Sequence, residues 1–172
     1  MLASRRGFAI AGTTGSALAM LAACSNSHGR GDTQPSASAL PSNQQEGAPY
    51  PADMEHLDQI LSLKGGQTLP EGAHVVSVKP ATNFARVFPG GWGYVIAFTA
   101  TDSSIRAYVT ERTGNPGKLI ERYPAALKVE GGLEDIDLSD ISNPWNCGLG
   151  QANVLLERPL GRGWLVILGG PR

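Results

Sequence analysis

Apolar side chains recur at helical spacing in two segments of the chain. The first segment spans residues 53–63, and Gly65-Gly66 follows it as a stop. Its apolar positions are Met54, Leu57, Ile60 and Leu61. The second segment follows Thr101, which offers an N-cap, and extends to about Thr113. We therefore predict two helices, each with one apolar face directed at a core.

Four further segments carry strand patterns. Residues 73–79 are rich in valine, residues 92–99 alternate between two faces, and a proline with two glycines at 88–91 supplies a turn between them. Residues 153–158 and 164–168 flank a short turn containing two glycines, which predicts a hairpin. The last segment is apolar without alternation, so we expect it at the centre of the sheet.

Three shorter segments carry weaker patterns. We expect a helical turn over residues 118–123 and short strands over residues 127–130 and 136–138. The order helix, strand, strand, helix, then strands is typical of the α+β class. We predict a small single α+β domain, with an antiparallel sheet of about four or five strands and two helices packed on one face.

Composition divides the chain before this domain. Residues 25–52 have only Leu40 and Tyr50 as sizeable apolar side chains, too few to offset the entropy of ordering the segment. We expect residues 24–52 to be a tether and residues 53–172 to be the globular domain, whose length is usual for one domain.

The first 23 residues carry an export pattern. Arg5 and Arg6 precede an uncharged stretch that ends in Leu21-Ala22-Ala23-Cys24. A basic start, a modestly apolar middle and small residues at the end are typical of a cleavable export sequence. The stretch is shorter and more polar than the roughly 20 apolar residues of a membrane span.

These residues resemble a bacterial lipoprotein signal peptide, and Ser4-Arg5-Arg6-Gly7-Phe8 resembles the twin-arginine motif. The resemblance implies that residues 1–23 are removed and that Cys24 receives a diacylglycerol and usually a further acyl chain such as palmitate. Ala9 stands where twin-arginine signals often have leucine, so the general secretory route remains an alternative.

The resemblance also implies where the mature protein lies. Two or more acyl chains on Cys24 hold a protein stably on a bilayer, so we expect a lipid anchor at the extracytoplasmic face of the cell membrane. The choice between inner and outer membrane stays open. The domain broadly resembles small uncharacterised lipoproteins of high-G+C bacteria, which have a similar tether and a short α+β domain.

Charge excludes one class of partner. Removing residues 1–23 lowers the Lys and Arg count from 14 to 12 against 15 acidic residues, which gives a formal charge of −3. Nucleic-acid binding calls for clustered basic residues, so we expect no such partner.

Cys147 is the first candidate for chemistry. A lipidated Cys24 has no thiol left to pair with it, so the favoured interpretation is a buried free thiol, with an exposed or intermolecularly paired thiol as an alternative. A nucleophilic role would need a histidine within hydrogen-bonding distance, and the domain offers His56 and His74. No local motif connects either histidine to Cys147.

Two other features invite a functional interpretation. Residues 134–140 contain four carboxylates, but the EF-hand spacing fails at Asp140, where glycine is required, and at Asn146, where glutamate is required. We expect a solvated acidic turn, with no metal and no cofactor.

Trp92 follows Gly90-Gly91 and is a weak candidate for an exposed aromatic binding residue.

The sequence favours a membrane-anchored binding or accessory module without enzymatic activity. Its ligand would be a membrane or envelope protein, an envelope polymer or a small molecule. The alternative is a small envelope hydrolase or thiol enzyme that uses Cys147 or the carboxylates of residues 134–140 together with His56 or His74.

Overall fold

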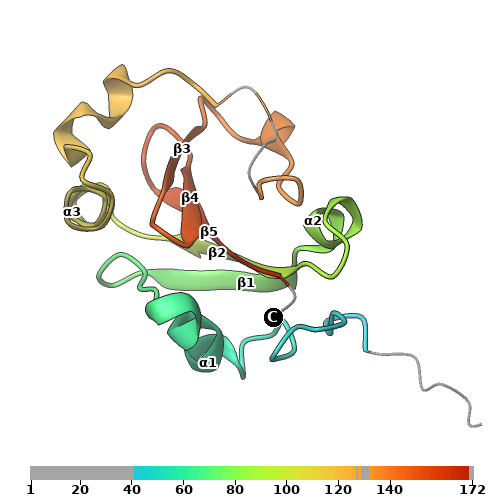
Figure 1. The fold of residues 1–172 in the computed structure, drawn as a ribbon. Helices are drawn as coiled ribbons and strands as arrows, with labels where there is room; N and C mark the ends of the chain where they lie inside the picture. The colour runs from blue at the N-terminus through green and yellow to red at the C-terminus, as the bar shows by residue number, and fades with distance from the viewer. Residues whose placement is uncertain (1–40, 127, 129–131, 171–172) are drawn as a thin grey trace, which may run out of the picture. The chain divides into compact units, whose positions relative to one another are not determined.

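One antiparallel sheet organises the domain, in the strand order β1-β2-β5-β4-β3 (Figure 1). The computed structural model describes residues 41–126, 128 and 132–170. The strands are β1 His74–Pro80, β2 Trp92–Thr99, β3 Trp145–Gly148, β4 Ala152–Leu156 and β5 Arg162–Gly169. The predicted α+β class and strand number are therefore confirmed.

The central strand is β5, as its uninterrupted apolar run predicted. It pairs with β2 from Trp92 opposite Gly169 to Thr99 opposite Arg162. Its other neighbour is β4, so the predicted hairpin is confirmed. The edge strand β1 pairs with β2 in an irregular register between Val75 and Ser77.

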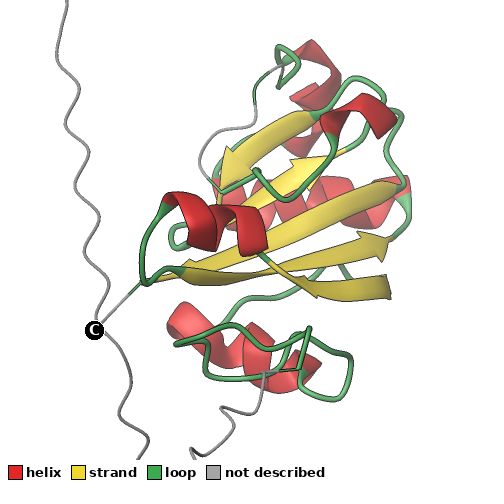
Figure 2. Ribbon diagram, turned by 90° about the vertical axis from the view of Figure 1, so that its right-hand side faces the viewer, coloured by secondary structure: helices red, strands yellow, loops and turns green. Residues whose placement is uncertain are grey.

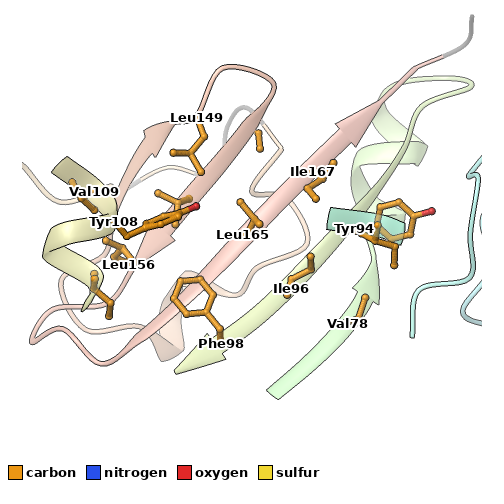
Figure 3. Packing of buried hydrophobic residues seen from close by; sticks show 14 of the residues in the cluster. Val78, Tyr94, Ile96, Phe98, Tyr108, Val109, Leu149, Leu156, Leu165 and Ile167 are labelled. Atoms are coloured by element: carbon orange, nitrogen blue, oxygen red, sulfur yellow. The ribbon is translucent and has the colours of Figure 1, made fainter. Parts of the chain in front are cut away.

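The first face of the sheet is covered by α1 Leu57–Ser62, α3 Asp102–Thr113 and the 3-10 helix η2 Gly117–Arg122. Tyr108 and Val109 of α3 pack with strand side chains such as Leu165 in one buried cluster (Figure 3). The two helices predicted from apolar spacing thus share one face, as expected. Thr101 caps α3 by accepting a hydrogen bond from the Ser104 amide, and Gly114 ends the helix at φ 70°.

The second face is covered by α2 Thr82–Val87 and by residues 133–141, which include the 3-10 helix η3 Leu138–Asp140. Leu133, Ile136 and Ile141 pack there against Val95, Leu155 and Val166. Figure 2 shows helices on both sides of the sheet. The expected strand over 136–138 is wrong, because its isoleucine is anchored in this cluster while the backbone turns.

The first helix is shorter than predicted. It begins at Leu57 instead of residue 53; before it, the Asp53 carboxylate accepts a hydrogen bond from the His56 amide and residues 54–56 form a turn. After α1 the chain continues through the 3-10 helix η1 Leu63–Gly65.

The segment expected to be a tether also differs in part. Within it, Ala52 is 4% exposed, and the Tyr50 amide donates to the Tyr94 hydroxyl of β2. Residues 41–52 therefore pack against the domain instead of preceding it. The export sequence, Cys24, and all but Lys128 of the expected strand over 127–130 lie outside the described residues.

Candidate functional site

A cleft of about 880 Å³ lies at the start of β2, beside Trp92. Four segments meet there: residues 45–49, the η1 turn, the stretch from Ala85 of α2 to Trp92, and Gly170 after β5. The lining residues on which the site depends are Gln45, Glu46, Lys64, Gly90, Gly91 and Trp92.

Trp92 is held in this cleft by its neighbours on the sheet. Its indole lies directly on the backbone of Gly169, where any Cβ would overlap the ring. Tyr94 meets the indole edge-on, with ring centroids 5.8 Å apart and an interplanar angle of 64°. The ring is half-buried, so it offers a fixed aromatic surface to a ligand.

The wall opposite the sheet comes from the segment that the sequence placed in the tether. The Gln45 side chain makes two hydrogen bonds to the Gly93 backbone, donating to its carbonyl at 2.9 Å and accepting from its amide at 3.0 Å. The pairing of β1 with β2 ends at Tyr94, and the Gln45 side chain bonds to the next β2 residue, Gly93. Glu46 and Gly47 are thereby fixed at the mouth of the cleft.

Lys64 brings a cation to the same cleft. Its Nζ lies 5.6 Å from the centre of the Trp92 ring, a cation–π distance. The Lys64 backbone has φ 54°, a left-handed conformation that costs roughly 1–2 kcal/mol in a residue with a Cβ. Gly65 and Gly66 follow with φ 85° and 83°. Strain of this kind is typical of ligand-binding positions.

The cleft contains two charged side chains without ion-pair partners among the described residues. Glu46 and Lys64 are both exposed, and neither has an ion-pair partner among the residues that the structure describes. The cleft therefore presents an aromatic ring, an ammonium group and a carboxylate to solvent. A cleft in which an aromatic ring lies beside convergent polar groups is a candidate site for a small ligand.

Cys147 lies elsewhere, on the edge strand β3. Burial raises the pKa of its thiol to about 11, only partly opposed by a hydrogen bond with Thr113. His74 lies on β1, the opposite edge, and four strand spacings of about 4.8 Å put these edges roughly 19 Å apart. His74 is therefore out of hydrogen-bonding distance of the thiol.

His56 also has other partners. Its Nδ1 lies 2.7 Å from Asp53 Oδ1, and its ring stacks on Tyr50 with centroids 6.1 Å apart. The hydrogen bond from His56 is the main reason why the pKa of Asp53 lies below its ordinary value. The structure thus does not assemble Cys147 with a histidine.

Two of the four carboxylates in residues 134–140 hold local structure together. Asp135 accepts hydrogen bonds from the Asn83 and Phe84 amides and from the Thr82 hydroxyl, which caps the start of α2. Asp137 accepts from the amide and hydroxyl of Ser139, and these bonds hold its pKa below the ordinary value. In residues 41–126, 128 and 132–170, no three metal-ligating side chains come together.

Comparison with known proteins adds no relative: no family model, curated protein or solved structure matches this chain. Among the described residues no helix is long and apolar enough to cross a membrane.

Sequence reasoning identified Trp92 but not its surroundings. Gln45 and Glu46 were assigned to the tether because their segment is polar, and only the long-range bonds to Gly93 show that it is part of the site. Gly65-Gly66 was predicted to stop the first helix, whereas the position of Lys64 over the Trp92 ring depends on tertiary packing.

Proposed function

We propose that this protein is an extracytoplasmic lipoprotein, anchored through Cys24, whose domain binds a cell-envelope ligand in the Trp92 cleft without catalysing a reaction. The anchor is supported by the resemblance of residues 1–24 to a lipoprotein signal peptide. The observation that carries the binding role is that Glu46 and Lys64, which have no ion-pair partner in the part of the chain that the structure describes, lie beside a fixed indole.

The chemistry of the cleft favours a segment of envelope glycan. The C–H face of a sugar ring packs on an indole, as apolar surfaces do on aromatic rings. A carboxylate of the fragment pairs with Lys64, while hydroxyl and amide N–H groups donate to Glu46. A disaccharide-peptide fragment of peptidoglycan combines a sugar face, hydroxyl and amide N–H groups with the free carboxylates of its peptide, so it is the appropriate probe.

Calorimetric titration of the mature domain with this fragment tests the proposal. Trp92→Ala should weaken binding about tenfold or more, because an aromatic anchor of this kind contributes a large share of the binding free energy. Trp164→Ala is the matched control, since Trp164 is also half-buried but lies on the second face of the sheet. Equal losses in both variants, or no binding by a folded wild type, would contradict the proposal.

The anchor has its own test. Cells that express Cys24→Ala should incorporate no labelled palmitate into the protein and should release it from membranes or accumulate its precursor. Labelling of the variant equal to that of the wild type would refute lipidation at Cys24.

The export route is tested by replacing Arg5 and Arg6 with lysine. Export through the twin-arginine route should stop, because its receptor reads the arginine pair. Unchanged processing and membrane association would assign the protein to the general secretory route instead.

A further inference from the structure

Two exposed apolar side chains are adjacent in sequence where α2 ends. Val87 is 68% exposed and Phe88 is 51% exposed. The other exposed large apolar side chains among the described residues, Met54 and Val76, are single. Single exposed apolar residues are ordinary, but an adjacent pair at the tip of a turn calls for an explanation.

The pair is held in its exposed position by the fold. Phe88 stacks on Phe84 of α2, with centroids 5.7 Å apart and an interplanar angle of 14°. The Gly91 amide donates to the Phe88 carbonyl at 2.8 Å, and a Cβ on Gly91 would lie 2.8 Å from that oxygen. A tight turn that only a small residue permits therefore presents Val87 and Phe88 to solvent.

This tip lies at the end of the domain where the chain enters from its N-terminal side. Ala85 and Gly90, which flank the pair, line the same cleft as Glu46 and Gly47. Sixteen residues separate Cys24 from Pro41. Because a chain extends by at most about 3.6 Å per residue, an anchor at Cys24 would keep this end of the domain within reach of the bilayer.

A cation beside the tip suits the same surface. Arg86 is exposed and donates to Asn83 Oδ1. Of the carboxylates near α2, Asp135 is hydrogen-bonded at the start of the helix and Glu46 lines the cleft, so neither is on residues 86–88 themselves. An apolar tip beside a cation matches the interface of a bilayer that contains anionic lipids, where apolar side chains enter the headgroup region and cations remain at its surface.

We propose that Val87 and Phe88 insert into the membrane surface and orient the domain, so that the Trp92 cleft opens beside the bilayer. The inference rests on the lipid anchor of the proposed function. It adds that the domain does not tumble freely on its tether and that the cleft meets its ligand at the membrane surface.

A fluorescent probe at two positions tests this orientation. The chain from residue 25 to 172, with a polyhistidine tag at its N-terminus and Cys147→Ser, is bound to phosphatidylethanolamine–phosphatidylglycerol vesicles that contain a nickel-chelating lipid. A nitrobenzoxadiazole label is attached to Pro89→Cys or to Ser103→Cys. Ser103 lies beyond the far end of β2, whose seven residue steps span about 23 Å.

We expect the label at position 89, but not at 103, to shift to the blue and to be shielded from an aqueous quencher. Adding Phe88→Ser should reduce the membrane-contacting fraction about tenfold, as loss of one buried aromatic side chain predicts. Equal spectra at both positions, or no effect of Phe88→Ser, would overturn the proposal. A blue shift without vesicles, accompanied by dimers in sedimentation, would also overturn it by assigning the tip to self-association.

The nickel tether separates this result from the question of lipidation. If Cys24 is not acylated in cells, the palmitate experiment fails while the label still reports whether the tip contacts lipid. If the tip does not insert, the labels are equivalent while palmitate incorporation and ligand binding are unaffected.

Discussion

The Trp92 cleft and the surroundings of Arg158 both combine a cation with aromatic rings, yet they differ in how the cation is partnered. Arg158 is 5% exposed and donates to the carbonyls of Ile120, Tyr123 and Asn143 and to the Asn143 side chain. Tyr123 in turn stacks on Trp145, with centroids 5.1 Å apart. Lys64 is exposed, and its ammonium lies over the Trp92 ring without an ion-pair partner among the described residues.

The difference separates structural polar groups from groups that can bind. A buried guanidinium whose acceptors are all backbone or amide oxygens joins η2 to the β3 and β4 region and has little left for a ligand. The exposed Lys64 ammonium beside the fixed Trp92 indole is free to bind an anionic group of a ligand. Whether a cation already has hydrogen-bond or ion-pair partners, more than its residue type, therefore identifies the Trp92 cleft as the candidate site.

The largest effect is expected at Arg158. Arg158→Met should lower the free energy of unfolding by about 3–5 kcal/mol, because it leaves several buried carbonyl oxygens without donors. Urea denaturation measures the change. Arg122→Ala in η2 is the control, since Arg122 is exposed and should change stability by less than about 0.5 kcal/mol. A similar small effect at Arg158 would remove the contrast between the two regions.

A smaller effect is expected at the floor of the cleft. Gly169→Ala should cost about 2–3 kcal/mol and displace the indole of Trp92, because the new methyl group overlaps the ring. Gly161→Ala is the matched control, with nothing within 4 Å of the added Cβ. Thermal unfolding and the indole N–H resonance report both effects, and unchanged indole resonances in Gly169→Ala would show that the ring is not fixed there.

The pH dependence of stability at alkaline pH tests the burial of Tyr108 on α3. Burial raises the pKa of Tyr108 from 10.0 to about 12, so the fold favours its neutral form. The stabilisation is present below pH 10 and is lost as pH rises toward 12, with a magnitude on the order of 2 kcal/mol. Tyr108→Phe should lack this part of the pH dependence, at the expense of the hydrogen bond to the Thr68 carbonyl. Parallel stability curves for both proteins from pH 9 to 12 would contradict the assignment.

The smallest effect on stability is expected at Cys147. Cys147→Ala should cost about 1 kcal/mol or less and leave ligand binding unchanged, since the thiol lies outside the cleft. A thiol pKa near 11 instead of 9.0 lowers the thiolate fraction at neutral pH about 100-fold. Reaction with a thiol reagent should therefore be slow in the native protein and fast in urea; fast native labelling would reopen the nucleophile hypothesis.

The sequence predicted the regular elements because their patterns are local. Apolar spacing located α3, alternation located β2, and the apolar run of β5 identified the central strand. The helix α2 was missed because its cap is Asp135, more than fifty residues later in the chain. A local pattern contains no information about such a partner.

The candidate site was predictable only in part for the same reason. Trp92 was singled out by its glycine neighbours, whereas Gln45 reads as part of a polar tether until its bonds to Gly93 are known. Cys147 was also a candidate from the sequence, but its reactivity depends on whether the thiol is buried, which only the packing decides. Its place beside Thr113 and Tyr108 comes from the pairing of β3 with β4.

Titration of the ¹⁵N-labelled mature domain with a disaccharide-peptide fragment of peptidoglycan tests whether the Trp92 cleft binds a ligand. We expect the resonances of the Trp92 indole N–H and of the Gly90 and Gly91 amides to shift and to saturate together. The indole N–H resonance of Trp145, which stacks on Tyr123 beside Arg158, should not shift. Shifts centred on Trp145, or none in a folded domain, would contradict the claim that the Trp92 cleft is the binding site.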